Sequence, residues 1–548
     1  MGLSNLLGIG ISSLLASQRD LANAGHNIAN VNTPGYSRQR VDLVSRPPQG
    51  AGNGFLGKGV EVSTVRRVYD QFLATQLRTS TSSHTYTEAF HELASRIDGL
   101  LAAPESGLSS ALQSFFAAVH DLADDPAPIP ARQLALSEGE GLVQRFHAIA
   151  GQLTDLQGAV NERLSGLAEE VNILAADIAN LNHGIAEAEG AAGGQPANDL
   201  RDQREELIRQ LAERIGITTL EQDDGAINIL ARNGQALVTG RSAAKLSMVP
   251  NAFDPIRHEI GITLGQTSAV ISDLVSAGEM GGILDFRTQV LDQAENFLGR
   301  VAIALAGTFN RQHGLGVDLA GNPGEDFFAP IDETSPKVLP HILNSPTSAS
   351  PAVTVTDPNE LTTSDYLLDY DGTTYTVTRL SDNTVNTFTD GAISIDGLSI
   401  DVSGGLAAGD RFLIQPTRTA AQDIGLVIAD NRQIAAGLSG NVGDNGNALA
   451  LAALQTTHTL ANGSATYEEA YGQLVTTVGA TTRRADGQRG AQEVLLNQVI
   501  EAREKVSGVN LDEEAASLLR YQQAYQASAR FIAVADDVLN SLLAAVGR

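Results

Sequence analysis

The chain has 548 residues, and its 36 Lys and Arg against 64 Asp and Glu give a formal net charge of −28. This length exceeds the roughly 250 to 300 residues at which a single core stops growing, so we expect several domains. The negative charge argues against nucleic acid and anionic membranes as partners, and the absence of Cys excludes disulfides and thiol chemistry. Two explanations of the missing Cys stay open, chance and export of the chain in an unfolded state.

The N-terminal 31 residues predict a long helix with a narrow apolar seam. Small and apolar residues alternate spacings of four and three, which is typical of a heptad pattern. The seam comprises Leu3, Leu7, Gly10, Leu14, Ser17, Leu21, Ala24, Ile28 and Val31. Only Arg19 and Asp20 carry a formal charge here, so the helix needs partners on several sides. The segment lacks a basic start and a cleavage site, and polar residues interrupt it, so we predict neither a cleavable signal nor a membrane span.

The stretch "NIANVNTPGYSRQR", residues 27–40, predicts the end of this helix near Asn32. Pro34 biases the residue before it toward extended geometry, and Gly35 can take a left-handed conformation, so the chain changes direction here. Residues 32–70 then hold six basic against three acidic side chains. This basic segment can offset repulsion between acidic copies of the chain, and the alternative is a solvated loop without a partner.

The middle of the chain predicts a long helix over roughly residues 131–190, which would span up to about 90 Å unless its glycines bend it. A further helix follows, with Asn198 or Asp199 as its expected cap. Residues 217–272 predict short strands, and helix returns from about Gly282 to His313.

Residues 351–415 alternate apolar and polar side chains between Asp-Gly and Gly-Gly turns, which predicts a small antiparallel β domain. From about Thr417 the pattern predicts helix again to the C-terminus. The last helix has a second heptad seam, formed by Leu511, Leu518, Tyr521, Tyr525, Ser528, Ile532, Ala535, Leu539, Leu542 and Val546. The two seams can belong to assembly helices or, as the simpler alternative, to two core helices of one domain.

The sequence contains no motif that predicts catalysis. Nucleophile elbows, Walker loops, zinc-protease motifs and dinucleotide-binding loops are all absent. His26, His120 and His147 stand singly in helical patterns, and the stretches "DYDG" and "DNGN" are better explained as turns than as calcium sites. The acidic residues 512–514 suit a helix start capped by Asn510. We therefore expect a protein that is not an enzyme, with no catalytic, cofactor-binding or metal-binding residues.

The stretch "NIANVNTPGYSRQ" resembles the N-terminal signature of the bacterial flagellar axial proteins, which are the rod, hook and hook-associated proteins. The residues of this axial motif are Ala29, Asn30, Asn32, Thr33, Pro34, Gly35 and Tyr36. Residues 59–78, 281–324 and 507–543 are similar, in the same order, to the flagellar hook-associated protein 1 family. The resemblance covers almost the whole chain.

This resemblance implies a structural adaptor that forms the junction layer between hook and filament and is needed for filament assembly. It also implies unfolded export through the flagellar type III apparatus and a secreted location on the flagellum. The implied partners are other copies in a helical layer, the hook protein, the next hook-associated junction protein, the filament cap, and an export chaperone that holds the helix 511–546. Another axial protein, such as a hook or distal rod subunit, is the nearest alternative, and a secreted adhesin is a more remote one.

The expected fold is mainly α with β insertions. We expect a coiled-coil-like terminal domain, a helical-bundle middle domain and a small antiparallel β outer domain. The predicted divisions are an N-terminal axial helix with its redirecting loop (1–45), a helical domain (46–345), the β domain (346–416), a returning helical segment (417–505) and a C-terminal axial helix that pairs with the N-terminal one (506–548).

Overall fold

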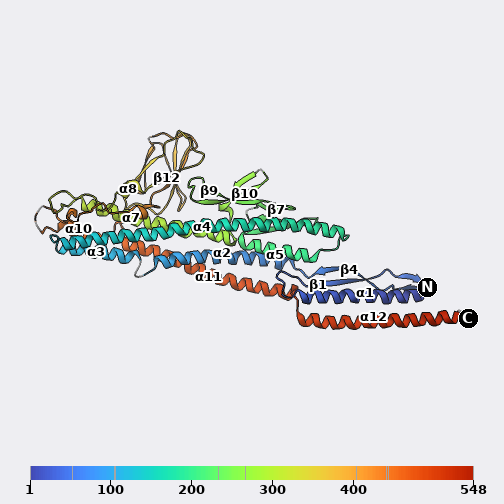
Figure 1. The fold of residues 1–548 in the computed structure, drawn as a ribbon. Coiled ribbons are helices and arrows are strands. Elements are labelled where there is room, and N and C mark those ends of the chain that lie inside the picture. Colours follow the sequence, from blue (N-terminus) through green and yellow to red (C-terminus); the bar gives the residue numbers. More distant parts are fainter. Residues whose placement is uncertain are drawn as a thin grey trace.

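The computed structural model describes residues 2–51, 54–103, 107–232, 234–265, 267–402, 404–439, 441 and 443–546. The molecule is a long rod of mostly antiparallel helices, with two groups of β-strands on one side of it (Figure 1). Both chain ends lie at the same end of the rod. The expected class, mainly α with β insertions, is confirmed.

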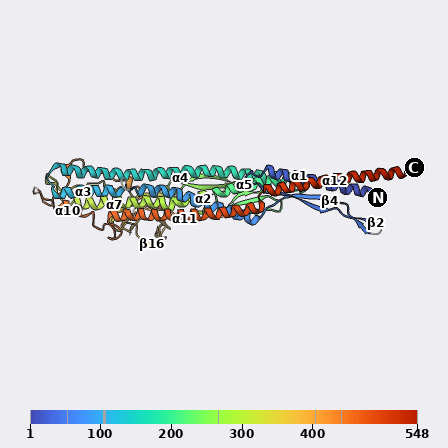
Figure 2. The ribbon, with the colours of Figure 1, turned by 90° about the horizontal axis from the view of Figure 1, so that it is seen from below.

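The first and last helices form an antiparallel pair, α1 (Gly2–Ala29) with α12 (Leu511–Val546), which extends beyond the helical body of the molecule (Figures 1 and 2). The Oγ atoms of Ser13 and Ser528 lie 2.8 Å apart across the pair. A side chain at Gly10 would lie 2.7 Å from Ile532 Cγ1, so the glycine permits a close approach of the two helices. The Asn510 side chain caps α12 by accepting hydrogen bonds from the amides of Asp512 and Glu513, as predicted.

A β ribbon follows α1 where the sequence predicted only a redirecting loop. Its strands pair antiparallel, β1 with β4 and β2 with β3. Their bounds are β1 (Gln39–Ser45), β2 (Gln49–Ala51), β3 (Gly54–Leu56) and β4 (Val60–Arg67). The alternation of Val41 and Leu43 with polar neighbours, and of Val60 and Val62 with theirs on β4, was the signal for this hairpin.

The body of the rod is a helical bundle in which α11 packs along α2 and α4 lies against α3 and α5. The long helix predicted over residues 131–190 is confirmed as α4, and its glycines do not interrupt it. The helices of the body are α2 (Gln71–Leu101), α3 (Leu108–Asp124), α4 (Ile129–Ala191), α5 (Asn198–Arg214), α6 (Gly278–Phe286), the π-helical turn η2 (Arg287–Leu291), α7 (Asp292–His313), α10 (Gly446–Ala453) and α11 (Tyr467–Ser507).

The strands predicted over residues 217–272 are also confirmed, and they form two small antiparallel sheets beside α4. One sheet has the order β5-β6-β7-β8 and the other β11-β10-β9. The bounds are β5 (Ile217–Glu221), β6 (Ile227–Ala231), β7 (Ala236–Thr239), β8 (Ser242–Ala243), β9 (Lys245–Pro250), β10 (His258–Leu264), β11 (Thr267–Val270) and the 3₁₀ turn η1 (Ser272–Leu274).

The outer β domain projects from the side of the rod (Figure 1). It contains a five-stranded sheet, β12-β19-β14-β15-β16, and a three-stranded sheet, β13-β18-β17. The strands are β12 (Lys337–Pro340), β13 (Ala352–Val355), β14 (Tyr366–Tyr370), β15 (Tyr375–Arg379), β16 (Thr384–Phe388), β17 (Ala392–Ile395), β18 (Leu398–Asp401) and β19 (Arg411–Gln415). Because β12 pairs with β19, the sheet begins before residue 346, the predicted start of this domain.

The returning segment 417–505 is helical only in part, contrary to the prediction. Short helices, α9 (Ala420–Asp423), η3 (Asn431–Gln433) and α10, alternate with irregular chain until α11 begins at Tyr467. The irregular chain is held by side chains of the body rather than by helical hydrogen bonds. For example, the buried His313 ring accepts the Ala435 amide at Nε2, 2.8 Å away, and bonds the Glu325 carbonyl through Nδ1. A short helix α8 (Ile331–Thr334) precedes the outer domain.

Candidate functional site at the joint of the terminal helices

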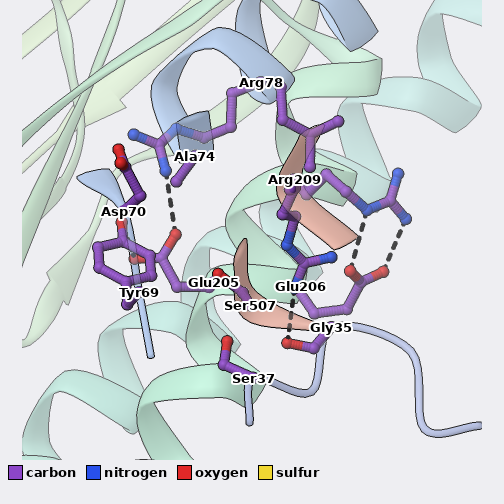
Figure 3. A pocket seen from close by; sticks show the side chains of 12 residues that line it. Gly35, Ser37, Tyr69, Asp70, Ala74, Arg78, Glu205, Glu206, Arg209 and Ser507 are labelled. Atoms are coloured by element: carbon purple, nitrogen blue, oxygen red, sulfur yellow. Dashed lines mark hydrogen bonds and ion pairs between the residues drawn. The ribbon is translucent and has the colours of Figure 1, made fainter. Parts of the chain in front are cut away.

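The axial motif forms a tight reverse turn directly after α1. The Tyr36 amide donates to the Thr33 carbonyl at 3.2 Å, and Gly35 has a φ of +78°, the left-handed conformation that its position predicted. A side chain at Gly35 would also lie 2.8 Å from Glu206 Cβ on α5 (Figure 3). Both the backbone angle and the close approach therefore require glycine.

Asn27 holds this turn to the ribbon, although it was not among the predicted motif residues. Its Oδ1 accepts the Tyr36 hydroxyl at 2.7 Å and the Gln39 amide at 2.9 Å, and its Nδ2 donates to the Gln39 carbonyl at 3.0 Å. The side chain is buried, with all these polar groups satisfied. Burial raises the pKa of the Tyr36 hydroxyl, and nearby carboxylates raise it further, so Tyr36 stays a hydrogen-bond donor. The only sequence signal for this role of Asn27 was its position a few residues before the predicted end of the helix.

The start of α5 forms the second side of the joint. The Ser37 amide and Arg67 Nη1 donate to the two carboxylate oxygens of Asp202, at 2.9 and 2.8 Å. Asn198 donates to the Val65 carbonyl at 2.7 Å, and Asp199 accepts from Gln39 Nε2 at the same distance. The prediction that Asn198 or Asp199 caps α5 is therefore wrong, since Ala197 is the cap residue and both side chains bind the ribbon instead.

The connection between α11 and α12 forms the third side. The Arg38 amide donates to the Ser507 carbonyl at 2.8 Å, and its guanidinium pairs with Glu513 at 2.9 Å and with the buried Glu514 at 2.7 Å. Arg503 on α11 donates to the Gly35 carbonyl at 3.0 Å. These contacts link the beginning of the chain to its end across more than 460 residues. We call the residues 27–39, 198–209 and 503–514 the joint.

The joint is lined by polar side chains and contains an open groove and a smaller cavity. An open groove of about 1060 Å³ separates the axial turn from the α11–α12 connection. A smaller cavity beside it is walled by the ion pairs Arg78–Glu205 and Arg209–Glu206 (Figure 3). Burial there raises the pKa of Tyr69 to about 12, so this hydroxyl also stays protonated and can donate to Glu205. Polar contacts of this kind fix an orientation without the tight packing of an apolar core.

The predicted seams meet in the terminal helix pair. Leu7, Leu14, Leu21 and Ile28 on α1 are half-buried, as are Leu518, Tyr525, Ile532 and Leu539 on α12. The side chain of Leu3 lies outside the described part of the chain. Leu511 and Leu542, which were also predicted for the C-terminal seam, are 51% and 45% exposed, so the pairing within the chain does not cover them. Of the axial motif, Gly35, Tyr36 and Asn30 are half-buried, while Ala29, Asn32, Thr33 and Pro34 face solvent.

Most of the basic segment is paired within the chain. Arg38, Arg46, Arg66 and Arg67 form ion pairs with carboxylates of the same molecule, which leaves Arg40 and Lys58 exposed. Within the described residues, no group of three or more His, Asp or Glu side chains is placed to hold a metal ion. None of the helices in that same part is long and apolar enough to cross a membrane.

Comparison with known proteins shows which class of protein has this architecture. Three family models match the chain: the helical domain of flagellar hook-associated protein FlgK over residues 94–328, the D2-like domain of flagellar hook-associated protein 1 over residues 341–416, and the C-terminal segment of the flagellar basal body rod FlgEFG proteins over residues 503–545. Paired terminal helices on a helical body, with these matches, define a structural protein of the bacterial flagellum.

Relatives that match the chain over its full length identify the family to which it belongs within this class. The chain is 36% identical to flagellar hook-associated protein 1 of Salmonella typhimurium and 35% identical to that of Escherichia coli K12, over 99% of this chain and 100% of each relative. The solved FlgK of Burkholderia pseudomallei, a flagellar hook junction protein, shares the fold with a TM-score of 0.73 at 24% identity, covering 79% of this chain and all of that one. The chain belongs to the flagellar hook-associated protein 1 family and is a hook-associated structural adaptor of the flagellum.

Proposed function

We propose that this chain forms the junction layer between hook and filament, and that the α1–α12 pair is the element through which its copies assemble. The observation that carries the proposal is the antiparallel pairing of the two chain ends into one unit that extends beyond the body (Figures 1 and 2). A unit of this shape can stack side by side with identical units around an axis, while the body and the outer domain stay outside.

A second apolar face on each helix supports this role. On α12, Phe531, Val534, Val538 and Leu542 remain exposed at helical spacing, and on α1 so do Ile11 and Leu15. An isolated helix pair gains nothing from these exposed side chains, whereas neighbouring copies would bury them. Leu542, which the pairing within the chain leaves uncovered, belongs to this second face.

The proposed partners follow from the same surface. Other copies would pack on the second faces, the hook protein and the next hook-associated junction protein would contact the two ends of the layer, and the filament cap would assemble beyond it. Before assembly, the exposed apolar face of α12 has no partner, and an export chaperone would cover it. The chain would then pass through the type III apparatus to a secreted location on the flagellum. The role is structural and not catalytic.

The test is the double variant Leu518→Asp with Ile532→Asp, as the only copy in the cell. The two half-buried positions lie two heptads apart on the face of α12 that packs on α1. A carboxylate forced into such a seam costs several kcal/mol, about 2 to 5 per site. We expect non-motile cells whose hooks, in electron micrographs, carry no filaments.

Gln523→Asp is the matched control, because Gln523 is exposed on the same helix and the same charge should be tolerated there. Swimming cells with normal filaments in the double variant would contradict the assembly role of α12. Cells without hooks would instead favour a hook or rod subunit.

A further inference from the structure

A second cavity beside the joint, of about 440 Å³, is rich in arginine. Five guanidinium groups line it, from Arg66, Arg67, Arg78, Arg201 and Arg204. The first turn of α5 reaches the same cavity through Asn198, and the partial positive charge of a helix N-terminus adds to that of the arginines. Only two carboxylates line it, Glu205 and Glu221. In a chain with a net charge of −28 this concentration of cationic groups is unusual.

Four of the five arginines are already compensated. Their ion pairs are Arg66 with Asp42 at 2.6 Å, Arg67 with Asp202 at 2.8 Å, Arg78 with Glu205 at 3.0 Å and Arg201 with Glu189 at 2.7 Å. The Arg78–Glu205 pair is visible in Figure 3. These pairs fix the positions of the guanidinium groups and leave the cavity preorganised.

Arg204 is the exception. Its side chain is only 1% exposed, and its Nη1 donates to the Asn182 side chain at 2.8 Å and to the Gly225 carbonyl at 2.9 Å. Its Nε has no hydrogen-bond partner, and among the described residues no carboxylate lies within ion-pair distance of the guanidinium. Burial lowers the pKa of Arg204 to about 10, which leaves it charged at neutral pH. Glu205 and Glu221 attract this buried cation only from beyond ion-pair distance, so an anion in contact with it would stabilise it further.

We propose that this cavity binds a multivalent oxyanion of the phosphate class, with Arg204 as the central cation and the first turn of α5 beside it. The planar guanidinium presents donors in a fork that suits phosphate oxygens, and helix N-termini accept phosphate groups readily. The anion would join β4, which supplies Arg66 and Arg67, to α5 and α2. Its binding therefore braces the joint, a function separate from the assembly role of the terminal helices.

The experiment uses the purified full-length chain and inorganic phosphate, with sodium chloride at matched ionic strength as the reference. A ligand that binds only the folded state raises the thermal midpoint, and ³¹P line broadening reports binding directly. The informative variant is Glu221→Gln, because Glu221 is exposed, forms no ion pair among the described residues and lies at the cavity. Removing its negative charge should tighten phosphate binding about threefold to tenfold.

Glu140→Gln is the matched control, an exposed glutamate near the other end of α4, and it should leave phosphate binding unchanged. Arg204→Gln should abolish binding, and if that variant does not fold, Glu221→Gln still decides the question. Equal effects of phosphate and chloride, or equal phosphate affinity in wild type and Glu221→Gln, would overturn the proposal. Stabilisation by citrate but not by phosphate would overturn the phosphate class and assign the cavity to a carboxylate.

Discussion

Arg418 lies where the outer β domain meets the helical body, and it contacts three carboxylates. Its nitrogens lie 2.6 Å from Asp292, 2.6 Å from Asp365 and 3.3 Å from Glu295. Arg257 also pairs with Asp292, at 2.7 Å, so two guanidinium groups face three acids. Burial raises the pKa of Glu295 to about 7, against the opposing effect of Arg418. One acid of this cluster therefore takes up a proton near neutral pH.

Glu295→Gln should change how stability depends on pH. The pKa of Glu295 in the folded state, about 7, lies above its unfolded value near 4.5. Its contribution to the free energy of unfolding is therefore fully present below about pH 4.5 and is lost as pH rises through about 7, in total about 3 kcal/mol. Urea unfolding at pH 8, 6 and 5 should show the variant more stable than wild type at pH 8, with this advantage gone at pH 5.

Glu162→Gln, an exposed change on α4, should keep the wild-type pH dependence. A constant difference between Glu295→Gln and wild type at every pH would show that Glu295 does not titrate in this range.

Among the elements, those with a long hydrophobic period were predictable from sequence. The heptad spacings over α1 and α12, and the stripe of α4, each repeat over many turns, so local exceptions do not obscure the helix or its buried face. The Pro34–Gly35 stop was predictable because it depends on backbone angles of single residues.

Elements that depend on distant partners were not predictable in this way. Asn198 has the side chain of a helix cap, but the Val65 carbonyl on the ribbon takes its hydrogen bond. The pairing of Arg38 with Glu514 joins residues far apart in the chain, and no local pattern connects them. The irregular chain after Thr417 has small and apolar residues like a helix, but tertiary contacts such as that of His313 hold it otherwise.

The α1–α12 pair offers a matched test in two neighbouring glycines. A side chain at Gly10 would meet Ile532 at 2.7 Å and Phe531 at 3.0 Å, whereas one at Gly8 would meet nothing within 4 Å. Leucine at either position raises helix propensity by about 1 kcal/mol, so the difference between the variants reports packing alone. We expect Gly10→Leu to destabilise the pair by about 1 to 3 kcal/mol relative to Gly8→Leu.

Tryptic cleavage after Arg530, an exposed residue of α12, measures this difference as the rate of opening of the pair. Faster cleavage in Gly10→Leu and unchanged or slower cleavage in Gly8→Leu is the expected pattern. Equal rates in the two variants would show that the helices do not pack closely at Gly10 in solution.

At the scale of the whole molecule, different parts of the rod have different roles. The terminal pair extends from one end, the joint fixes it to the body, and the outer domain projects from the side away from the chain ends (Figure 1). The outer domain is nevertheless tied to the body, because Asp365 pairs with Arg418 and Asn359 accepts the Gly463 amide at 2.7 Å. It is thus an insertion with a defined base and not a freely tethered module.

Removal of the outer domain should leave a folded and assembly-competent rod if the cut follows the sheet. Lys337 and Gln415 face each other across β12 and β19, so residues 338–414 can be replaced by a short Gly-Ser linker without straining either end. The variant loses Asp365, but Asp292 and Glu295 still compensate Arg418. We expect full helical circular dichroism per molecule, one cooperative unfolding transition, and filaments in cells that carry only this variant.

Deleting 351–415 instead provides the control, because it leaves β12 without its partner strand and exposes an unpaired edge, so this variant should aggregate. A loss of helical signal in the 338–414 deletion would mean that the body requires the outer domain in order to fold, and filament loss with the body intact would mean that the outer domain, and not only the terminal pair, takes part in assembly.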